Sequence, residues 1–311
     1  MEVAAVTRMK KPKNKKMVPI QKGELITIVS PAKSIETEHV TFAKELIESK
    51  GFRVAISSHC IGKHHYFSGT DKERAQDFQQ ALDDPEVKAV LCARGGYGCI
   101  QILHLINWTK FHANPKWIIG FSDITVLHQR ILGYGISALH ASMPLNFELN
   151  STESIDSLFT VLKGERPSYT IQAHPLNQKG SAKGKLVGGN LSILYSLIGT
   201  DDEVDYTDTI LFIEDVGEQI YHIDRIFYSL FKSGILGKIK GVLVGGMTQL
   251  KDTENPFGKS IYEVISSHIS CYHIPLAFDF PAGHIEDNRA LVLGENVFFI
   301  VNDSVTLNYI N

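Results

Sequence analysis

The stretch Lys116-Trp-Ile-Ile-Gly-Phe-Ser-Asp-Ile-Thr-Val-Leu-His128 contains a short apolar run that stops at Gly120 and is followed at once by helix-like spacing. This pattern predicts a buried strand, a sharp turn and a helix, with Ser122 at the turn. A serine presented in this way resembles a nucleophile elbow, although the final glycine of Gly-x-Ser-x-Gly is missing. Serine is also a preferred helix N-cap, so a capping role alone would explain the same residues.

Strand and helix alternate in the same way through the first half of the chain. Short connections between them are typical of a parallel sheet with helices on both faces. In such sheets ligands bind beyond the carboxyl ends of the strands. The predicted strands are Leu25–Val29, Arg53–Ser57, Val87–Cys92, the run from Trp117 and Ile136–His140, and the predicted helices are Glu36–Lys50, Lys72–Leu82, Ile100–Ile106 and the segment from Asp123.

The glycine-rich segment Arg94-Gly-Gly-Tyr-Gly98 follows the strand Val87–Cys92 and is expected to face the same crevice as Gly120–Asp123. It lacks the Lys-Ser/Thr of a P-loop and the spacing Gly-x-Gly-x-x-Gly, so a phosphate or dinucleotide site is poorly supported. The glycines would suit an oxyanion hole, in which a glycine N–H and the Asp123 N–H point at one developing negative charge. A tight strand-to-helix turn is the structural alternative.

The sequence changes character from Phe147 to Gly180, where Asn, Ser, Thr, Pro and Gln are frequent and only Ile155–Leu162 has helical spacing. We place the domain boundary there. The second half is richer in β structure, with strands expected in Lys185–Ser192, Thr209–Asp215, Ile239–Gly246, Leu276–Phe280 and Ala290–Asn308, and helices at Tyr221–Lys232 and Ser260–Ser267. The predicted organisation is a basic tail (1–23), a domain that bears Ser122 (24–150), a linker (151–182) and a second domain (183–311).

Composition narrows the classes of function. The 311 residues include 31 basic and 34 acidic side chains, and the net charge of −3 favours neither a nucleic acid polymer nor a membrane surface as partner. No apolar run is long enough to predict a membrane span. The four cysteines form no Cys-x-x-Cys pair and are interpreted as reduced thiols, and no metal or cofactor is predicted. The lysine-rich residues 1–22 predict a disordered tail, with a targeting or nucleic-acid arm as the alternative.

A nucleophilic serine needs a base, and the base needs a group that orients it. Among the 13 histidines, His284 lies in the glycine- and proline-containing loop Pro281–Arg289, which follows a predicted strand. Loops at strand ends are where such bases are commonly held. The sequence therefore makes His284 the first candidate for the base.

The strand Thr209–Asp215 ends in two carboxylates. Period-two alternation places Glu214 and Asp215 on opposite faces, so only one of them can face the crevice. A solvated strand end is the structural alternative for this pair. A glycosidase that pairs Glu214 with Asp123 or Glu286 is a competing chemical hypothesis.

Five ordered motifs resemble the LD-carboxypeptidase family of serine peptidases, which also includes the microcin C immunity peptidases. The resemblance runs from about Leu25 to the C-terminus. The motifs are Ala93-Arg-Gly-Gly-Tyr-Gly98, Ile119-Gly-Phe-Ser-Asp-Ile-Thr125, Leu186-Val-Gly-Gly-Asn-Leu191 with Gly199-Thr200, Phe212-Ile-Glu-Asp215, and Gly283-His284 with Asn288-Arg-Ala290.

This resemblance implies a catalytic triad with Ser122 as nucleophile, His284 as base and Glu214 as orienting residue. It implies an oxyanion hole formed by the backbone N–H groups of Gly96 and Asp123. The implied fold is an N-terminal Rossmann-like or flavodoxin-like α/β domain with a parallel sheet and a C-terminal α/β domain that contains a β-barrel. The implied protein is a cytoplasmic homodimer that cleaves the amide bond before the terminal D-alanine of murein tetrapeptides, a small peptide substrate.

The residues that would recognise the substrate are less well defined. Arg94 and Arg289 flank the motifs and are candidates for binding a substrate carboxylate, because a guanidinium binds a carboxylate bidentately. Phe67 or Tyr97 could instead form an aromatic platform for a peptidyl-nucleotide, as in the microcin immunity branch. A non-catalytic α/β cleft protein is the alternative of a different class.

Two segments depart from the family pattern. The first strand ends in Ser30-Pro31-Ala32 where Pro-Ser is expected, and His140-Ala-Ser-Met143 replaces His-Gly-Pro-Met. Both border the expected crevice, so they affect the expectation about the substrate and not the one about the triad. The basic tail before Leu25 has no counterpart in the pattern.

Overall fold

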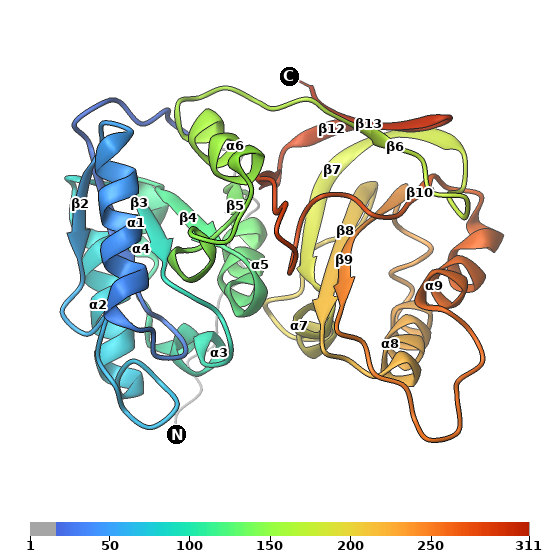
Figure 1. Ribbon diagram of the computed structural model, residues 1–311, viewed down its shortest axis with the longest axis horizontal. Helices are drawn as coiled ribbons and strands as arrows, with labels where there is room; N and C mark the ends of the chain where they lie inside the picture. The colour runs from blue at the N-terminus through green and yellow to red at the C-terminus, as the bar shows by residue number, and fades with distance from the viewer. Residues whose placement is uncertain (1–16, 311) are drawn as a thin grey trace.

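The computed structural model describes residues 17–310, which form two sheets that lie side by side with helices packed on them (Figure 1). The first is a six-stranded sheet in which strands β1 to β5 are parallel, as the alternating pattern predicts. Its order is β11-β5-β4-β3-β1-β2, with β1 at Leu25–Val29, β2 at Arg53–Ile56, β3 at Val87–Cys92, β4 at Trp117–Gly120, β5 at Ala138–His140 and β11 at Leu291–Leu293.

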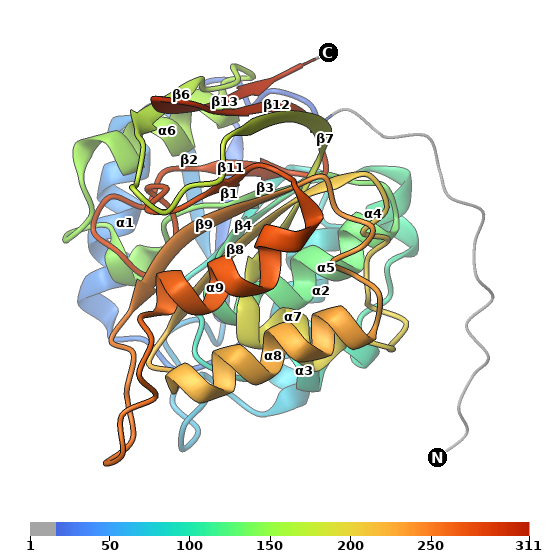
Figure 2. The ribbon, with the colours of Figure 1, turned by 90° about the vertical axis from the view of Figure 1, so that its right-hand side faces the viewer.

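Helices cover both faces of the first sheet. Figure 2 places α1 and α6 on one face and α2, α4 and α5 on the other. The start of α2 is fixed by a capping box, in which Thr70 and Glu73 satisfy each other's backbone N–H groups. The helices are α1 (Thr37–Ser49), α2 (Asp71–Asp83), α3 (Cys99–Ile102, continued by a 3₁₀ turn at Leu103–Leu105), α4 (Thr109–Ala113), α5 (Thr125–Gly133) and α6 (Thr152–Leu162).

The second sheet has seven strands and confirms the expected β-rich second half. A bridge between Gln178 and Leu276 connects the chain before β7 to the edge strand β10, so the sheet curls back on itself. Helices α7 (Leu191–Leu197), α8 (Ile220–Lys232) and α9 (Ile261–Ile269) pack on it. The strand order is β10-β9-β8-β7-β12-β13-β6, with β6 at Tyr169–Gln172, β7 at Gly180–Asn190, β8 at Thr209–Val216, β9 at Gly241–Thr248, β10 at Leu276–Ala277, β12 at Asn296–Val301 and β13 at Ser304–Tyr309.

The chain passes between the two halves at places that a simple two-domain division does not predict. Residues 151–182, predicted as a linker, contribute α6 to the first half and β6 to the second sheet. Apolar spacing explains α6, because Phe159 is buried and stacks on Phe52 with 5.9 Å between ring centroids. Strand β11, expected with the second half, instead pairs antiparallel with β5 of the first sheet.

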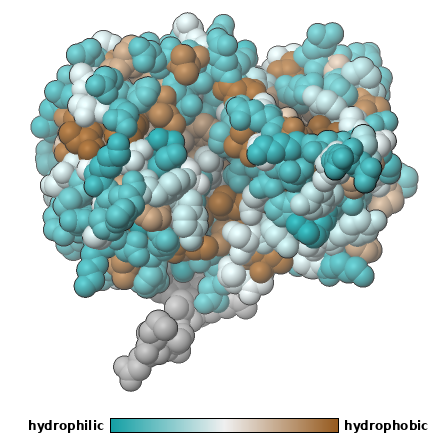
Figure 3. Space-filling view, turned by 60° about the horizontal axis from the view of Figure 1, so that its bottom comes forward, coloured by the Kyte–Doolittle hydropathy of each residue, from teal (hydrophilic) through white to brown (hydrophobic). Residues whose placement is uncertain are grey.

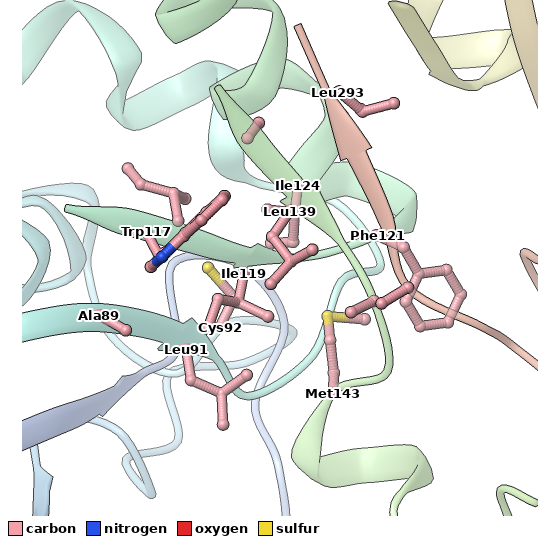
Figure 4. Packing of buried hydrophobic residues seen from close by; sticks show 14 of the residues in the cluster. Ala89, Leu91, Cys92, Trp117, Ile119, Phe121, Ile124, Leu139, Met143 and Leu293 are labelled. Atoms are coloured by element: carbon pink, nitrogen blue, oxygen red, sulfur yellow. The ribbon is translucent and has the colours of Figure 1, made fainter. Parts of the chain in front are cut away.

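The apolar core is continuous from the first sheet into the second. Figure 4 shows its part around β4 and β5, where Trp117, Ile119, Leu139 and Phe121 pack together. The same cluster includes Phe212 of β8. Full burial of one such side chain stabilises the fold by roughly 1.5–3 kcal/mol, so the strands that carry the site residues are held firmly.

The predicted tail at residues 1–23 lies for its first 16 residues outside the described part of the chain. Its last residues belong to the folded body, because Met17 and Ile20 are buried and the Ile20 N–H donates to the Leu162 carbonyl at 2.7 Å. Between residues 17 and 310, no helix combines the length and apolar character that a membrane span requires.

Candidate active site

Ser122 lies at the turn between β4 and the helical segment that leads into α5, as the sequence predicts. Its φ of +62° is unusual for a residue with a side chain and costs about 1–3 kcal/mol. Gly120, two residues before Ser122, has a φ of +155°, and a Cβ there would lie 2.8 Å from Cγ1 of Ile124. The residue in the N-cap position is Phe121, and no side chain caps this turn, so capping does not account for Ser122.

The glycine-rich segment after β3 lies directly against Ser122. A Cβ on Gly95 would be 3.0 Å from the Ser122 Oγ and 3.1 Å from the Asp123 backbone N. A Cβ on Gly96, whose φ is +104°, would instead meet Lys33 and Tyr66, both at 3.0 Å. The two strand-end segments therefore converge, and the residue that touches Ser122 is Gly95.

The side chain of Asp123 connects these two segments. Its Oδ2 accepts a hydrogen bond from the Cys99 N–H at 2.8 Å, at the start of α3. The carboxyl group is almost completely buried, and burial raises its pKa, with the Cys99 hydrogen bonds opposing the shift. This carboxylate has a structural partner and supports the turn.

His284 and Glu214, both from the second half of the chain, are hydrogen-bonded to each other. Nδ1 of His284 donates to Oε2 of Glu214 at 2.6 Å, and Glu214 is fully buried. Burial lowers the pKa of His284, but the charge and hydrogen bond of Glu214 and the charge of Asp215 outweigh it, so the net shift is upward from 6.5. A carboxylate held at this nitrogen fixes the tautomer in which Nε2 is free to accept a proton.

The strand alternation predicted for β8 is confirmed. Phe212 packs in the core shared with the first sheet, whereas Ile213 packs in the core under α8 and α9. Glu214 consequently faces His284, and Asp215 points the other way, where it accepts hydrogen bonds from Asn190 Nδ2 at 3.0 Å and from the Ser192 N–H at 2.9 Å. Of the two carboxylates, Glu214 is the one that holds the histidine.

The ring of Phe121 joins the serine segment to the histidine segment. It packs edge-on against the His284 ring with 4.8 Å between centroids, and its own backbone immediately precedes Ser122. On its other side it contacts the buried ring of His140 at 5.7 Å. The loop that carries His284 is held by Asn288, whose Oδ1 accepts from the Gly283 N–H at 2.7 Å. The structure thus brings the segments of Ser122, Glu214 and His284 to one place.

Contacts between α5 and β7 fix the two halves beside this site. Thr125 Oγ1 accepts from the Asn190 N–H at 3.1 Å, and Gln129 Nε2 donates to the Gly188 carbonyl at 3.0 Å. A Cβ on Gly189 would lie 2.6 Å from Thr125 Oγ1, so only glycine allows this approach. Figure 3 shows the surface hollowed between the two halves.

Comparison with known proteins matches this arrangement to one family. Residues 26–141 match the LD-carboxypeptidase N-terminal domain, and residues 183–298 match the LD-carboxypeptidase C-terminal domain. The chain belongs to the LD-carboxypeptidase family. It is therefore a peptidase, a hydrolase of peptide bonds.

Relatives across the LD-carboxypeptidase family cover nearly the whole chain. The murein tetrapeptide carboxypeptidase of Pseudomonas aeruginosa is 30% identical over 87% of this chain and 91% of its own. The crystal structure of muramoyltetrapeptide carboxypeptidase from Oxalobacter formigenes superposes with a TM-score of 0.85 at 26% identity, covering 92% of this chain and 99% of that one. The microcin C7 self-immunity protein of Escherichia coli is 27% identical over 86% of this chain and 88% of its own.

Membership of the LD-carboxypeptidase family corrects two hypotheses drawn from the residues alone. The glycosidase pairing of Glu214 with Asp123 or Glu286 is wrong, because Asp123 is tied to Cys99, Glu286 is exposed, and the family is a peptidase family. The alternative of a non-catalytic cleft protein is replaced by the peptidase assignment for the same reason. Within residues 17–310, no group of three or more His, Cys, Asp or Glu side chains is arranged to hold a metal.

The residues named for substrate recognition have different surroundings. Arg289 makes a bidentate ion pair with Asp287, in which Nη2 of the arginine lies 2.9 Å from Oδ2. Arg94 donates to the Ser34 carbonyl at 3.0 Å. Tyr97 is 48% exposed and lies 6.3 Å from Phe67 between ring centroids. The two aromatic rings proposed as a platform are therefore neighbours, whereas both arginines already have partners.

Sequence reasoning missed several residues that shape the site. Local patterns do not distinguish Gly95 from its neighbouring glycines, because its position beside Ser122 depends on a contact between two strand-end segments. The sequence predicts Phe121 only as part of the turn, whereas its ring contacts His284. Asn288 belongs to the fifth motif, and its spacing of five residues from Gly283 is the sequence signal for a hydrogen bond that closes this loop.

Proposed function

We propose that the chain is a serine-type LD-carboxypeptidase that removes the terminal D-alanine from murein tetrapeptides in cell-wall recycling. The observation that carries this proposal is the 2.6 Å hydrogen bond between His284 and Glu214, together with the packing of the His284 ring on Phe121 next to Ser122. The murein tetrapeptide relative supports the choice of substrate.

Catalysis starts when Nε2 of His284 takes the proton of Ser122 Oγ as this oxygen attacks the scissile carbonyl carbon. Glu214 holds the imidazole and stabilises the imidazolium that forms. The negative charge on the carbonyl oxygen is stabilised by the N–H groups of Asp123 and Gly96, since their segments lie against Ser122. The positive φ of Ser122 supports this role, because a nucleophile elbow holds its residue in a strained turn.

The tetrahedral intermediate collapses when His284 gives its proton to the leaving nitrogen, and D-alanine departs with a free amino group. Water then attacks the ester on Ser122, again with His284 as base, and the tripeptide is released as a carboxylic acid. Both steps use the same pair of side chains and return the enzyme to its starting state.

A direct test compares the unmodified protein with Ser122→Ala on a tetrapeptide with an LD-linked terminal D-alanine. We expect the variant to lose release of D-alanine while its thermal unfolding shows an intact fold. Ser196→Ala, on the exposed side of α7, is the matched control and should keep full activity. Turnover by Ser122→Ala would contradict the assignment of the nucleophile.

A microcin-type substrate is the second candidate. It is supported by the E. coli self-immunity relative and by the neighbouring rings of Tyr66, Phe67 and Tyr97, on which a nucleobase could stack. Incubation with an aminoacyl adenylate linked by a stable amide, beside the tetrapeptide, distinguishes the two. Cleavage of the aminoacyl adenylate without release of D-alanine from the tetrapeptide would favour this second candidate.

The resemblance also implies features of the whole protein that we include in the proposal. We expect a cytoplasmic homodimer that acts without a cofactor, with domains at 24–150 and 183–311 that carry Ser122 and the Glu214–His284 pair, respectively. Sedimentation of the purified protein would measure the dimer. A monomer at micromolar concentration would contradict this part.

A further inference from the structure

A carboxypeptidase must recognise the free carboxylate at the end of its substrate, and a cation near the nucleophile is the usual means. In an LD-linked tetrapeptide this carboxylate lies three bonds beyond the scissile carbonyl carbon. The cation must therefore reach the immediate surroundings of Ser122. Basic side chains that contact the glycine-rich segment beside Ser122, or lie in the glycine-rich segment or the His284 loop, include Lys33, Arg74, Arg94 and Arg289.

The three arginines are already engaged. Arg74 is buried and donates to the carbonyls of Gly69, Pro31 and Gly98. Arg94 donates to the Ser34 carbonyl, and Arg289 is paired bidentately with Asp287. Moving any of these guanidinium groups to a substrate would leave a carbonyl or a carboxylate without its partner, which opposes such a movement.

Lys33 differs from all three. Its side chain is half-buried, and no carboxylate of residues 17–310 lies within ion-pair distance of its ammonium group. Its Nζ lies 4.8 Å from the centre of the Tyr66 ring, which holds a cation by its π face without neutralising its charge. Among residues 17–310, no carboxylate therefore competes with an incoming anion for this ammonium group.

Lys33 also lies close to the nucleophile. A Cβ on Gly96 would be 3.0 Å from Cβ and 3.4 Å from Cδ of Lys33, so the stem of the lysine runs along Gly96. A Cβ on the preceding residue, Gly95, would likewise be 3.0 Å from Ser122 Oγ. Gly95 and Gly96 are adjacent, with Cα atoms about 3.8 Å apart, so Ser122 and the lysine stem pack against neighbouring residues of the same glycine-rich segment.

Neighbouring backbone keeps Lys33 in this position. Lys33 forms an antiparallel bridge with Phe67, and the Ser34 N–H donates to the Tyr66 carbonyl at 3.1 Å. The loop after β1 is thus attached to the loop after β2, and both lie beside the glycine-rich segment. The sequence difference in this strand end, noted at Ser30–Ala32, immediately precedes the lysine.

We propose that Lys33 binds the terminal carboxylate of the substrate and so makes this enzyme an exopeptidase. The assignment rests on the proposed LD-carboxypeptidase function. Tyr66 orients the ammonium group beneath the substrate, and the bound carboxylate places the scissile carbonyl over Ser122. An endopeptidase substrate, or one whose end is an amide, lacks the charge that Lys33 recognises.

The test uses two tetrapeptides that differ only at the end, one with terminal D-alanine and one with D-alaninamide. For the unmodified protein we expect kcat/KM to favour the acid by about 10- to 100-fold. Lys33→Met should lower kcat/KM for the acid by a similar factor, mainly through KM, and leave the amide within twofold. Lys33→Arg should restore most of the preference, because it restores the charge.

Lys63→Met is the matched control, since Lys63 is an exposed lysine in the adjoining loop whose ammonium lies 3.8 Å from Glu36. It should leave both substrates unchanged. An unchanged acid preference in Lys33→Met, or an equal loss on both substrates, would overturn the assignment while leaving the proposed function standing. Cleavage of neither substrate by the unmodified protein would overturn the proposed function and the assignment of Lys33 with it.

Discussion

The Cα of Gly283 lies so close to the side chain of Glu214 that a Cβ on Gly283 would be only 2.7 Å from the Glu214 Cβ and 2.8 Å from its Oε2. Gly283 also has a φ of +108°, which other residues rarely adopt. It directly precedes His284. The absence of one methyl group thus allows the carboxylate and the imidazole to meet.

Gly283→Ala should therefore separate Glu214 from His284. We expect kcat to fall by at least 100-fold, since the imidazole loses its orientation, and the free energy of unfolding to fall by about 1–3 kcal/mol. Steady-state kinetics and urea denaturation measure the two effects. Gly258→Ala is the control: Gly258 also has a positive φ of +79°, but a Cβ there meets no atom within 4 Å, so activity should remain.

Glu214→Gln tests the orienting carboxylate with little change of shape. Loss of the negative charge should lower kcat by about 10²- to 10⁴-fold while the fold is kept, as expected for the third member of a triad. Glu286→Gln, an exposed carboxylate two residues after His284, should have no effect. Equal activity of the two variants would remove Glu214 from the mechanism.

The pH dependence of activity should report His284. The base acts in its neutral form, and its pKa lies above 6.5, so kcat/KM should rise with pH through a midpoint above that value. Glu214→Gln should move the midpoint down, because the charge and hydrogen bond that raise the pKa are lost. A midpoint that does not respond to this substitution would contradict the assignment of His284 as base.

The same shift predicts a pH dependence of stability. Because the folded-state pKa of His284 is raised, the protonated imidazole stabilises the folded state fully below the unfolded pKa of about 6.5, and this contribution is lost as pH rises through the folded pKa. In His284→Gln the free energy of unfolding should lack this decrease as pH rises from about 6.5 through the folded-state pKa. Denaturation curves at several pH values would measure the difference.

Ser122→Gly should separate stability from activity. Glycine adopts the φ of +62° without strain, so the variant should be more stable by about 1 kcal/mol and inactive. His273→Gly, at another non-glycine position with a φ of +53°, should gain stability similarly without losing activity. A Ser122→Gly variant that is less stable than the unmodified protein would argue against strain at the turn.

Local patterns predict most of the first sheet. Strands β1 and β3 occupy Leu25–Val29 and Val87–Cys92 as predicted, and α1 and α2 differ from their predicted bounds by one residue at each end. These elements have clear periodicity and clear ends, such as Thr70 before α2. Helix α4 was missed because five residues are too few to show a helical period.

Long-range pairing explains what local patterns could not reveal. Nothing in Leu291–Leu293 distinguishes a strand of the second sheet from the edge strand of the first, since both environments bury apolar side chains. Likewise, the pattern at β8 established that Glu214 and Asp215 diverge, but which of them meets His284 depends on the contact of Gly283 with the Glu214 side chain. From the sequence, Glu214 could be chosen over Asp215 only through the resemblance of the ordered motifs to the LD-carboxypeptidase family.

The position of β11 has a consequence for how the protein is made. The edge of the first sheet is completed by Leu291–Leu293, which leaves the ribosome after the other five strands of that sheet. The half that carries Ser122 therefore has β5 unpaired on one side until this segment is made, and the same segment follows soon after His284 in the chain. Closure of the first sheet and the arrival of His284 beside Ser122 therefore depend on the same segment of the chain.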